Sequence, residues 1–337
     1  MAINKKLFIK SAAGGVTPSE NFNVVEYTGN GTTTKEVSVG FTPDWVWVKS
    51  LVDDSHYLVD SVRGDGVFLF SNSNVANDFN SAHLKLITNG FDAMSNPNVS
   101  SREYISWSWK GGGAAVSNPN GTTSSTISLN SDAGFSIVKT SSAGGTINVG
   151  HGLGSDISMI ILKGADTAEA WQVWHKDLGT GKYLQLSSTA QATTRANSFS
   201  TVNSTIFENN WTSGSVEWIV YSFAEISGYS KFGTYNGSSS EHTVDFGFAP
   251  AFVMIKRTDT SGGWRMFDYK RDSGTGERRV DHSLQAQSTG AQFDSSGTTN
   301  GEYLRFTDTG LKFPTYATNQ DVNNSSGTYI YMAFARD

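Results

Sequence analysis

The chain contains no cysteine, which excludes a disulfide framework, a thiolate zinc site, an iron–sulfur site and a cysteine nucleophile. Charged residues are also scarce, at 17% of the 337 residues against roughly 25% in ordinary soluble domains. The formal net charge is −6, from 25 Lys and Arg against 31 Asp and Glu. Because phosphate backbones attract basic surfaces, this balance argues against a nucleic-acid partner. No apolar run approaches the roughly 18 residues of a spanning helix, so we expect no membrane insertion.

The chain also lacks segments with the 3.6-residue apolar period of an amphipathic helix. It is instead rich in aromatic residues, with 9 Trp, 12 Tyr and 20 Phe, and it has 35 Gly against 6 Pro. Short apolar and aromatic runs alternate with Asn-Gly, Gly-Gly and Ser-Gly pairs, a pattern typical of strands bounded by turns. The sequence therefore predicts an all-β protein with enough aromatic surface to form a core.

Four sequence elements recur three times in the same order, which predicts three tandem structural units. They are a glycine-containing segment, a run of four apolar residues before a lysine, an aromatic segment and a closing apolar strand. The closing strands begin at residues 104, 218 and 329, at spacings of 114 and 111 residues. The lysines that end the second element are Lys49, Lys163 and Lys256.

The faces of these strands predict how the units are built. The closing strands have one fully apolar face, such as Ile105, Trp107 and Trp109 in the first copy. The runs before the lysines are apolar on both faces, as expected for a central strand that is covered on two sides. About 90 to 110 residues of such strands suit one β-sandwich. We therefore expect three tandem β-sandwich modules that follow a short N-terminal arm.

The spacing of the elements sets the expected boundaries. We place an arm at residues 1–22, modules at 23–110, 132–227 and 228–337, and a linker at 111–131. The linker is rich in Gly, Ser, Thr and Asn, a composition typical of flexible segments. The lysine and the closing strand lie 55 residues apart in the first two modules but 73 apart in the third, so we expect an insertion within 271–301.

The motifs predict no catalytic residue, no cofactor and no metal site. Residues 179–182 read Gly-Thr-Gly-Lys, but Lys176 stands where a phosphate-binding loop needs glycine, and Tyr183 stands where it needs Ser or Thr. A hairpin turn is the better interpretation. His175 and Asp177 are close in sequence, but the six His residues show no metal-ligand spacing.

Two features are candidate contacts for a receptor or a neighbouring subunit. Trp211 lies in a turn-like context, Asn-Asn-Trp-Thr-Ser-Gly, where its ring either stacks on a sugar or folds back over the edge of its module. The densest polar cluster, residues 277–282, lies in the expected insertion and includes Arg278, Arg279 and His282. This cluster is either a solvated loop or a contact loop, since insertions on a rigid scaffold often bind partners.

Parts of the chain resemble a repeat family found in virion proteins of tailed bacteriophages, especially marine phages and cyanophages. One part is residues 41–49 with 56–64, Phe-Thr-Pro-Asp-Trp-Val-Trp-Val-Lys and His-Tyr-Leu-Val-Asp-Ser-Val-Arg-Gly. Another is residues 224–233, which run into 248–258. The resemblance covers nearly all of residues 23–337. That family is a module of unknown function, so the resemblance implies a lectin-like or jelly-roll-like sandwich and a phage structural protein, and it transfers no functional residue.

The leading hypothesis is a non-enzymatic virion protein, a tail fibre or receptor-binding adhesin that contacts host-surface glycan. We expect a homotrimer, because such fibres are usually built so, and docking through residues 1–22 to a tail hub, an adaptor or the capsid. One alternative is a capsid decoration or head-fibre protein anchored by the same arm. Another is a polysaccharide-degrading tailspike, which needs two carboxylates about 5 to 10 Å apart. Its candidate carboxylates are Glu217, Glu225, Asp268 and Glu302.

Overall fold

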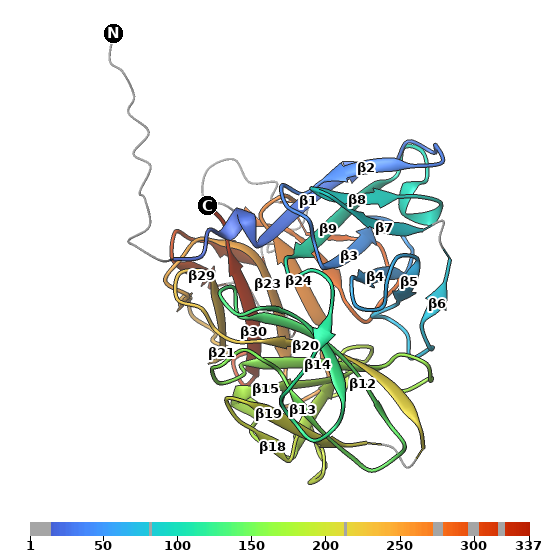
Figure 1. The fold of residues 1–337 in the computed structure, drawn as a ribbon. Coiled ribbons are helices and arrows are strands. Elements are labelled where there is room, and N and C mark those ends of the chain that lie inside the picture. The colour runs from blue at the N-terminus through green and yellow to red at the C-terminus, as the bar shows by residue number, and fades with distance from the viewer. Residues whose placement is uncertain (1–14, 81–82, 212–213, 272–278, 296–302, 316–320) are drawn as a thin grey trace.

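The computed structural model describes residues 15–80, 83–211, 214–271, 279–295, 303–315 and 321–337. These residues form thirty strands and three short 3-10 helices, and no α-helix occurs among them. Neighbouring strands pair antiparallel. The all-β class predicted from the sequence is confirmed. Figure 1 shows three groups of strands gathered around a common centre.

The first group is a six-stranded sheet packed against a three-stranded sheet. The large sheet has the order β1 (Phe22–Thr28), β9 (Glu103–Trp109), β3 (Trp45–Ser50), β4 (His56–Asp60), β5 (Val67–Leu69) and β6 (Asp78–Phe79). The small sheet has the order β2 (Lys35–Ser38), β8 (Gly90–Ala93) and β7 (Leu84–Ile87). Helix η1 (Pro18–Glu20) precedes β1, and helix η2 (Asn96–Asn98) precedes β9.

The second group pairs an eight-stranded sheet with a three-stranded one. The large sheet has the order β10 (Val116–Ser117), β11 (Ser125–Asn130), β12 (Phe135–Ser142), β20 (Val216–Phe223), β14 (Met159–Gly164), β15 (Gln172–His175), β16 (Lys182–Gln185) and β17 (Thr193–Thr194). The small sheet has the order β13 (Thr146–Gly150), β19 (Ile206–Asn210) and β18 (Thr201–Val202). Helix η3 (Lys176–Leu178) follows β15.

The third group pairs a six-stranded sheet with a four-stranded one. The large sheet has the order β21 (Ser230–Asn236), β30 (Thr328–Ala335), β23 (Pro250–Arg257), β24 (Trp264–Asp268), β26 (His282–Gln285) and β27 (Phe293–Asp294). The small sheet has the order β22 (His242–Asp245), β29 (Gly310–Phe313), β28 (Leu304–Phe306) and β25 (Arg279–Val280). The three runs of apolar residues before a lysine lie in β3, β14 and β23, inside their sheets as predicted.

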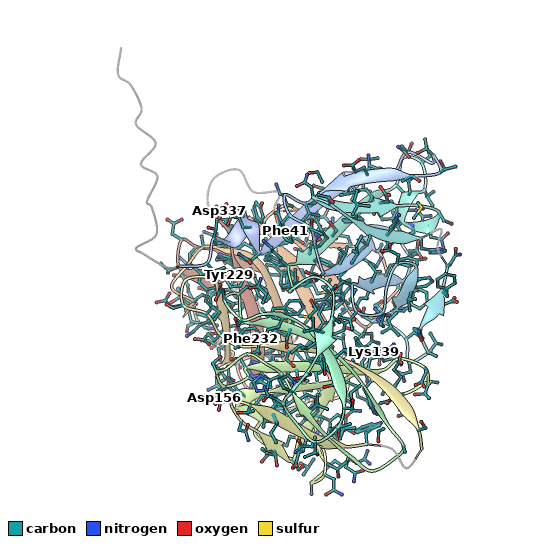
Figure 2. All side chains as sticks on the ribbon, viewed as in Figure 1. Phe41, Lys139, Asp156, Tyr229, Phe232 and Asp337 are labelled. Atoms are coloured by element: carbon teal, nitrogen blue, oxygen red, sulfur yellow. The ribbon has the colours of Figure 1, made fainter. Side chains whose placement is uncertain are left out.

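Each large sheet presents one face to its small sheet and the other face to a core that all three large sheets share. Strand β3 shows this division, since Val46 and Val48 pack toward the small sheet while Trp45 and Trp47 belong to the shared core. Three further clusters fill the spaces within the three groups. Figure 2 shows side chains occupying the spaces between the sheets.

Aromatic residues near the ends of the three closing strands meet in the shared core. The ring centroids of Trp109 and Phe223 are 6.5 Å apart, those of Phe223 and Phe334 are 6.0 Å apart, and those of Trp109 and Phe334 are 5.7 Å apart. Such pairs contribute roughly 0.5–1.5 kcal/mol each beyond the area they bury. The three large sheets therefore pack directly on one another.

Residues 111–131, expected as a flexible linker, differ from that expectation. They contain β10 and β11, and β11 pairs with β12 along its whole length. Polar Ser, Thr and Asn side chains are compatible with strands near a sheet edge, where the backbone pairs and the side chains reach solvent. Composition alone therefore could not distinguish a linker from added strands.

The expected arm also differs where it is described, because residues 1–14 lie outside the described residues. Val16 packs against the shared core, and Phe22 is part of that core with 2% of its surface exposed. The Phe22 ring centroid lies 4.8 Å from that of Phe334. The segment before β1 is therefore attached to the body from Val16 onward. Of the expected insertion at 271–301, residues 272–278 and 296–301 lie outside the described residues, and β25, β26 and β27 form within the rest.

Candidate functional site

The large sheets meet along three contacts, which we call seam 1/2, seam 2/3 and seam 3/1 after the groups they join. One backbone hydrogen bond recurs at all three. It runs from Asn77 to the Ala165 carbonyl at 2.6 Å, from Ala192 to the Thr258 carbonyl at 3.0 Å, and from Gln292 to the Leu51 carbonyl at 2.8 Å. Each accepting residue lies two positions after one of the lysines Lys49, Lys163 and Lys256.

A second hydrogen bond, from a side chain, also recurs at each seam. The indole of Trp171 donates to the Phe70 carbonyl at 2.9 Å, and the indole of Trp264 donates to the Gln185 carbonyl at 2.8 Å. At seam 3/1 the corresponding donor is His56, whose Nε2 lies 3.0 Å from the Gln285 carbonyl oxygen. The indole of Trp47 donates to Nδ1 of His56, so the proton of the neutral ring is on Nε2.

The three lysines, each the last residue but one of β3, β14 or β23, are fully buried. Their ammonium groups donate to backbone carbonyls: Lys49 to Ser50 and Val52, Lys163 to Gly164 and Thr167, Lys256 to Arg257 and Thr189. Burial lowers the pKa of each lysine to about 8, and carboxylates act in the opposite direction: Asp54 for Lys49, Glu169 for Lys163 and Asp321 for Lys256.

Buried polar side chains make a third kind of contact between the large sheets, and the residues involved differ from seam to seam. At seam 1/2 the Tyr221 hydroxyl donates to the Asp60 carboxylate at 2.7 Å, and Arg63 pairs with the same carboxylate at 2.6 Å. At seam 2/3 the ring of His175 bonds to the Tyr331 carbonyl, and burial lowers its pKa to about 3. The Arg271 guanidinium, paired with Asp268, lies 5.9 Å from the Trp107 ring at seam 3/1.

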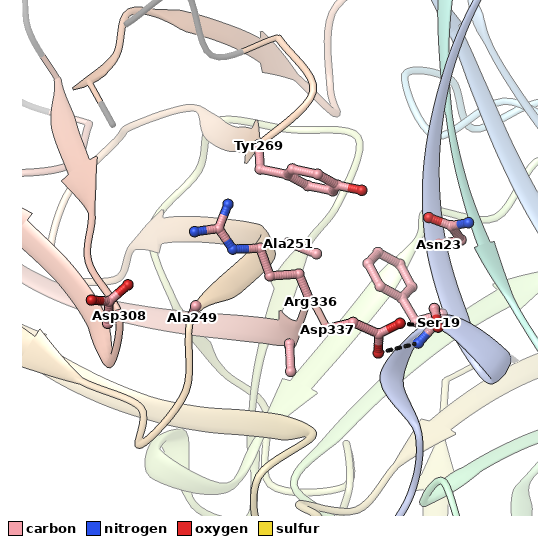
Figure 3. A pocket seen from close by; sticks show the side chains of 10 residues that line it. Ser19, Asn23, Ala249, Ala251, Tyr269, Asp308, Arg336 and Asp337 are labelled. Carbon is pink, nitrogen blue, oxygen red and sulfur yellow. Dashed lines mark hydrogen bonds between the residues drawn. The ribbon is translucent and has the colours of Figure 1, made fainter. Parts of the chain in front are cut away.

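A cleft of about 510 Å³ opens at seam 3/1, where β1 begins and β30 ends (Figure 3). Phe22, Ala251 and Ala335 are its buried apolar residues. Its polar residues are Ser19, Asn23, Tyr269, Asp308, Arg336 and Asp337. The Ser19 hydroxyl and backbone N–H both donate to the Asp337 carboxylate, which ties the segment before β1 to the segment after β30.

The other two seams differ at the corresponding place. Seam 1/2 has a second cleft, of about 570 Å³, lined by residues from 15–21, 110–111, 129–132 and 226–227. At seam 2/3 the chain passes directly from β20 into β21. There the Glu225 carboxylate pairs with Lys176 at 2.9 Å and with Lys231 at 2.5 Å.

Trp211, a candidate contact residue, is half-buried after β19. Its indole donates to the Glu169 carboxylate at 2.8 Å, and its ring lies edge-on to that of Tyr183 with centroids 4.9 Å apart. The Arg195 guanidinium carbon lies 4.4 Å from the ring centroid. The ring thus packs against the edge of its own sheet pair, the second of the two placements considered for it.

Of the polar cluster at 277–282, Arg278 lies outside the described residues. Arg279 pairs with Asp281 at 3.5 Å, and the Nε2 of His282 lies 3.6 Å from the carboxylate of Asp294. His282 also bonds through Nδ1 to the Arg271 carbonyl at 2.7 Å. These residues belong to the third group and Trp211 to the second, so they form separate surface clusters.

The sequence did not single out the residues that accompany these candidates. Tyr183, Glu169 and Arg195 surround Trp211, and a similar cluster in the third group combines Arg265 with Asp321 and the rings of Tyr303 and Phe293. The arginine and aromatic content of these segments was visible in the sequence. Their assembly depends on loops that only the fold brings together.

The carboxylates considered for catalysis, where described, pair with basic residues. Glu217 pairs with Lys139 at 2.9 Å, Glu225 with two lysines and Asp268 with Arg271, while Glu302 lies outside the described residues. The Nδ1 atom of His175 lies 3.5 Å from the Oδ2 atom of Asp177. Within the described part of the chain, no group of three or more His, Asp or Glu side chains is placed to hold a metal ion. The helices of the described residues, η1 to η3, have three residues each, too few to span a bilayer.

Comparison with known proteins identifies the family of this chain. Residues 17–337 match a domain of unknown function, DUF7483, and the chain belongs to that family. The match includes η1 and all thirty strands. No curated protein matches the sequence.

Proposed function

We propose that this member of a family of unknown function is a structural protein of a tailed-phage particle, a tail-fibre or receptor-binding component that contacts host-surface glycan. In this proposal the three groups of strands are three β-sandwich modules of one repeat. The observation that carries the proposal is their packing around one shared core, with the same two hydrogen bonds at each seam. Sheets that are joined by a shared core and by these hydrogen bonds hold their surface loops in fixed positions, which suits recognition of a rigid partner.

Exposed apolar side chains near the seams support a binding role. Val75 and Phe79 are 48% and 68% exposed and lie two residues on either side of Asn77 at seam 1/2. Val52 and Phe293 are 48% and 50% exposed and follow the two residues that bond at seam 3/1. Aromatic rings on a surface are favoured at recognition sites, where they contribute large contact areas.

The shared core also bears on the expected homotrimer. Within one chain, Trp109, Phe223 and Phe334 form a three-membered aromatic contact, one ring from each group. We therefore propose that the body of residues 16–337 is itself a three-part unit, and that docking to other virion proteins falls to the part of the arm before Val16. A trimer would then form through that arm or through a partner.

Immunogold labelling of intact particles with an antibody against residues 228–337 tests this function. Label at the tail is the expected result. Label spread over the capsid would replace the adhesin with a capsid decoration or head-fibre protein. Absence of label from every particle would overturn the virion assignment, and a polysaccharide-degrading tailspike with it.

A further inference from the structure

The cleft at seam 3/1 is open because of how the chain is connected. At seam 2/3 the closing strand β20 continues through residues 224–229 into β21, so the chain itself occupies the corresponding place. Backbone bonds there, such as that from Tyr229 to the Ile226 carbonyl at 3.0 Å, hold the connection in a tight turn. At seam 3/1 the corresponding strands are β30 and β1, which lie at opposite ends of the described chain, so no such turn fills the space.

Small side chains keep this cleft open. Ala249, Ala251 and Ala335 line it together with Phe22. Figure 3 shows Ala249 and Ala251 close to the Arg336 side chain. A volume of about 510 Å³ lies within the roughly 300–1,000 Å³ of small-molecule sites. This space is sufficient for a sugar ring, and its apolar residues suit the C–H face of such a ring.

The polar groups around the cleft are mixed in sign and include both donors and acceptors. Figure 3 shows Tyr269 and Asn23 on different sides of the opening, with the Arg336 side chain between Asp308 and Asp337. The Arg336 guanidinium carbon lies 5.8 Å from the Tyr269 ring centroid. The Asn23 amide donates to the Val39 carbonyl at 2.7 Å, which fixes its orientation.

This chemistry discriminates among ligand classes. Two carboxylates disfavour phosphate, sulfate and acidic sugars, because like charges repel at short range. The guanidinium disfavours a bare cation for the same reason. A neutral polyhydroxylated ligand can accept from the guanidinium and amide, donate to the carboxylates and rest its C–H face against the apolar residues.

We propose that this cleft binds one residue of a neutral saccharide. The inference rests on the proposed function and deepens it, since it names a site and a class of glycan for the contact. Arg336 and Asn23 act as donors, Asp308 and Asp337 as acceptors, and the three alanines leave the space for the ring.

Saturation-transfer NMR on the full chain tests the site, with methyl glycosides of glucose, galactose and mannose as probes and glucuronate as the acidic comparison. We expect at least one neutral glycoside to bind and glucuronate to bind at least about tenfold more weakly. Ala249→Trp fills the cleft and should lower affinity at least about tenfold, because a bulky side chain occupies the ligand's space. Arg336→Ala removes a donor and should weaken binding in the same direction.

Ala196→Trp, on an exposed loop of the second group, is the matched control and should bind as the unmodified chain does. Thermal unfolding establishes that each variant is folded. Equal binding by Ala249→Trp and the unmodified chain, preference for glucuronate, or absence of binding to all three neutral glycosides would overturn the inference. Tail labelling without saccharide binding would refute the cleft alone, whereas cleft binding without particle labelling would refute the virion function alone.

Discussion

At the scale of single residues, two neighbouring positions differ in size between the first and third groups. One lies two residues before the buried lysine, and the other lies opposite that lysine on the next strand. In the first group β3 carries Trp47, and the residue opposite Lys49 on β4 is His56. In the third group β23 carries the smaller Met254, and the residue opposite Lys256 on β24 is Trp264. Each arrangement places one indole in the shared core and one N–H donor at the seam, since His56 and Trp264 both reach a carbonyl of the neighbouring sheet.

Exchanging the two positions in the first group tests this compensation. His56→Trp alone should destabilise the protein by about 1–3 kcal/mol through overpacking against Trp47. Trp47→Ile alone should cost about 2–5 kcal/mol, because it leaves a cavity and removes the donor to His56. The loss of unfolding free energy in the double variant should be smaller than the sum of the two single losses by about 0.5–3 kcal/mol. Denaturant unfolding of the four proteins measures this coupling, and simple additivity would contradict it.

The buried lysines predict a pH dependence of stability. A lysine with a folded pKa near 8 and an unfolded value near 10.5 binds fewer protons in the folded state between those pH values. The free energy of unfolding that each lysine contributes therefore rises as the pH rises from 8 to 10.5. Below pH 8 the lysine is protonated in both the folded and the unfolded protein. The full free-energy cost of burying its charge then lowers the stability of the folded state.

Lys256→Met should flatten this dependence. Between pH 8 and 10 the slope of unfolding free energy against pH should decrease by up to about 1.4 kcal/mol per pH unit, the effect of one proton. Burial raises the folded-state pKa of tyrosines such as Tyr229 and Tyr235, so their ionisation in the unfolded state near pH 10 lowers stability, but this effect is common to both proteins. Lys85→Met, at an exposed position, is the control and should leave the slope unchanged. Equal slopes for Lys256→Met and the unmodified chain would contradict the prediction.

At the scale of elements, β10 and β11 are an addition that the other two groups lack. The large sheets of the first and third groups end at β1 and β21, whereas β12 in the second is covered by β11. The pairing runs from Ser125 opposite Thr140 to Asn130 opposite Phe135. Ser125 and Ile127 are buried while Thr126 is exposed, so the segment has a burial alternation that its polar composition hides.

Thr126→Pro tests whether residues 125–130 act as a paired strand or as a flexible linker. Proline removes an N–H and its fixed φ disturbs the strand between β10 and β12, so we expect a loss of about 3 kcal/mol in unfolding free energy. Thr126→Ala keeps the backbone N–H and should cost less than about 1 kcal/mol. Hydrogen exchange along β12 should accelerate only in the proline variant. A proline variant as stable as the alanine variant would show that β11 contributes nothing to the sheet.

At the scale of the whole molecule, the shared core couples the three groups. The Trp45 ring stacks on that of Tyr221 with centroids 4.3 Å apart, although the two residues belong to different groups. Phe22 and Phe334 form a similar contact at seam 3/1. No group can separate from the others without exposing aromatic surface, so we expect the body to unfold in one cooperative transition.

Trp109→Ala should weaken all three groups together. The ring contacts residues of both other groups, and its removal should cost about 3–5 kcal/mol. Hydrogen exchange should accelerate in β14 and β23 as well as in β3. Phe79→Ala, which truncates an exposed ring, should change the unfolding free energy by less than about 0.5 kcal/mol. Faster exchange confined to the first group would show instead that the groups are independent.

The sequence by itself determined the fold class and the central strands. Periodicity of two and the apolar runs before Lys49, Lys163 and Lys256 predict β3, β14 and β23, because burial on both faces requires apolar residues at successive positions. It did not reveal that β11 is a strand, since pairing of its backbone is invisible in a polar composition. It also did not predict that Phe22 belongs to the core, because a single aromatic residue forms no repeating pattern from which burial could be inferred.

Only the tertiary structure decided how the sheets are joined and where a ligand has room. The seams depend on donors such as Trp171 meeting carbonyls such as that of Phe70, and neither residue carries a local sign of the other. The cleft combines Asn23 near the start of the body with Tyr269 and Arg336 from its last group. Local sequence encodes strand and face through short-range sterics and burial, whereas these sites arise from long-range packing, which depends on which strand ends the fold brings together.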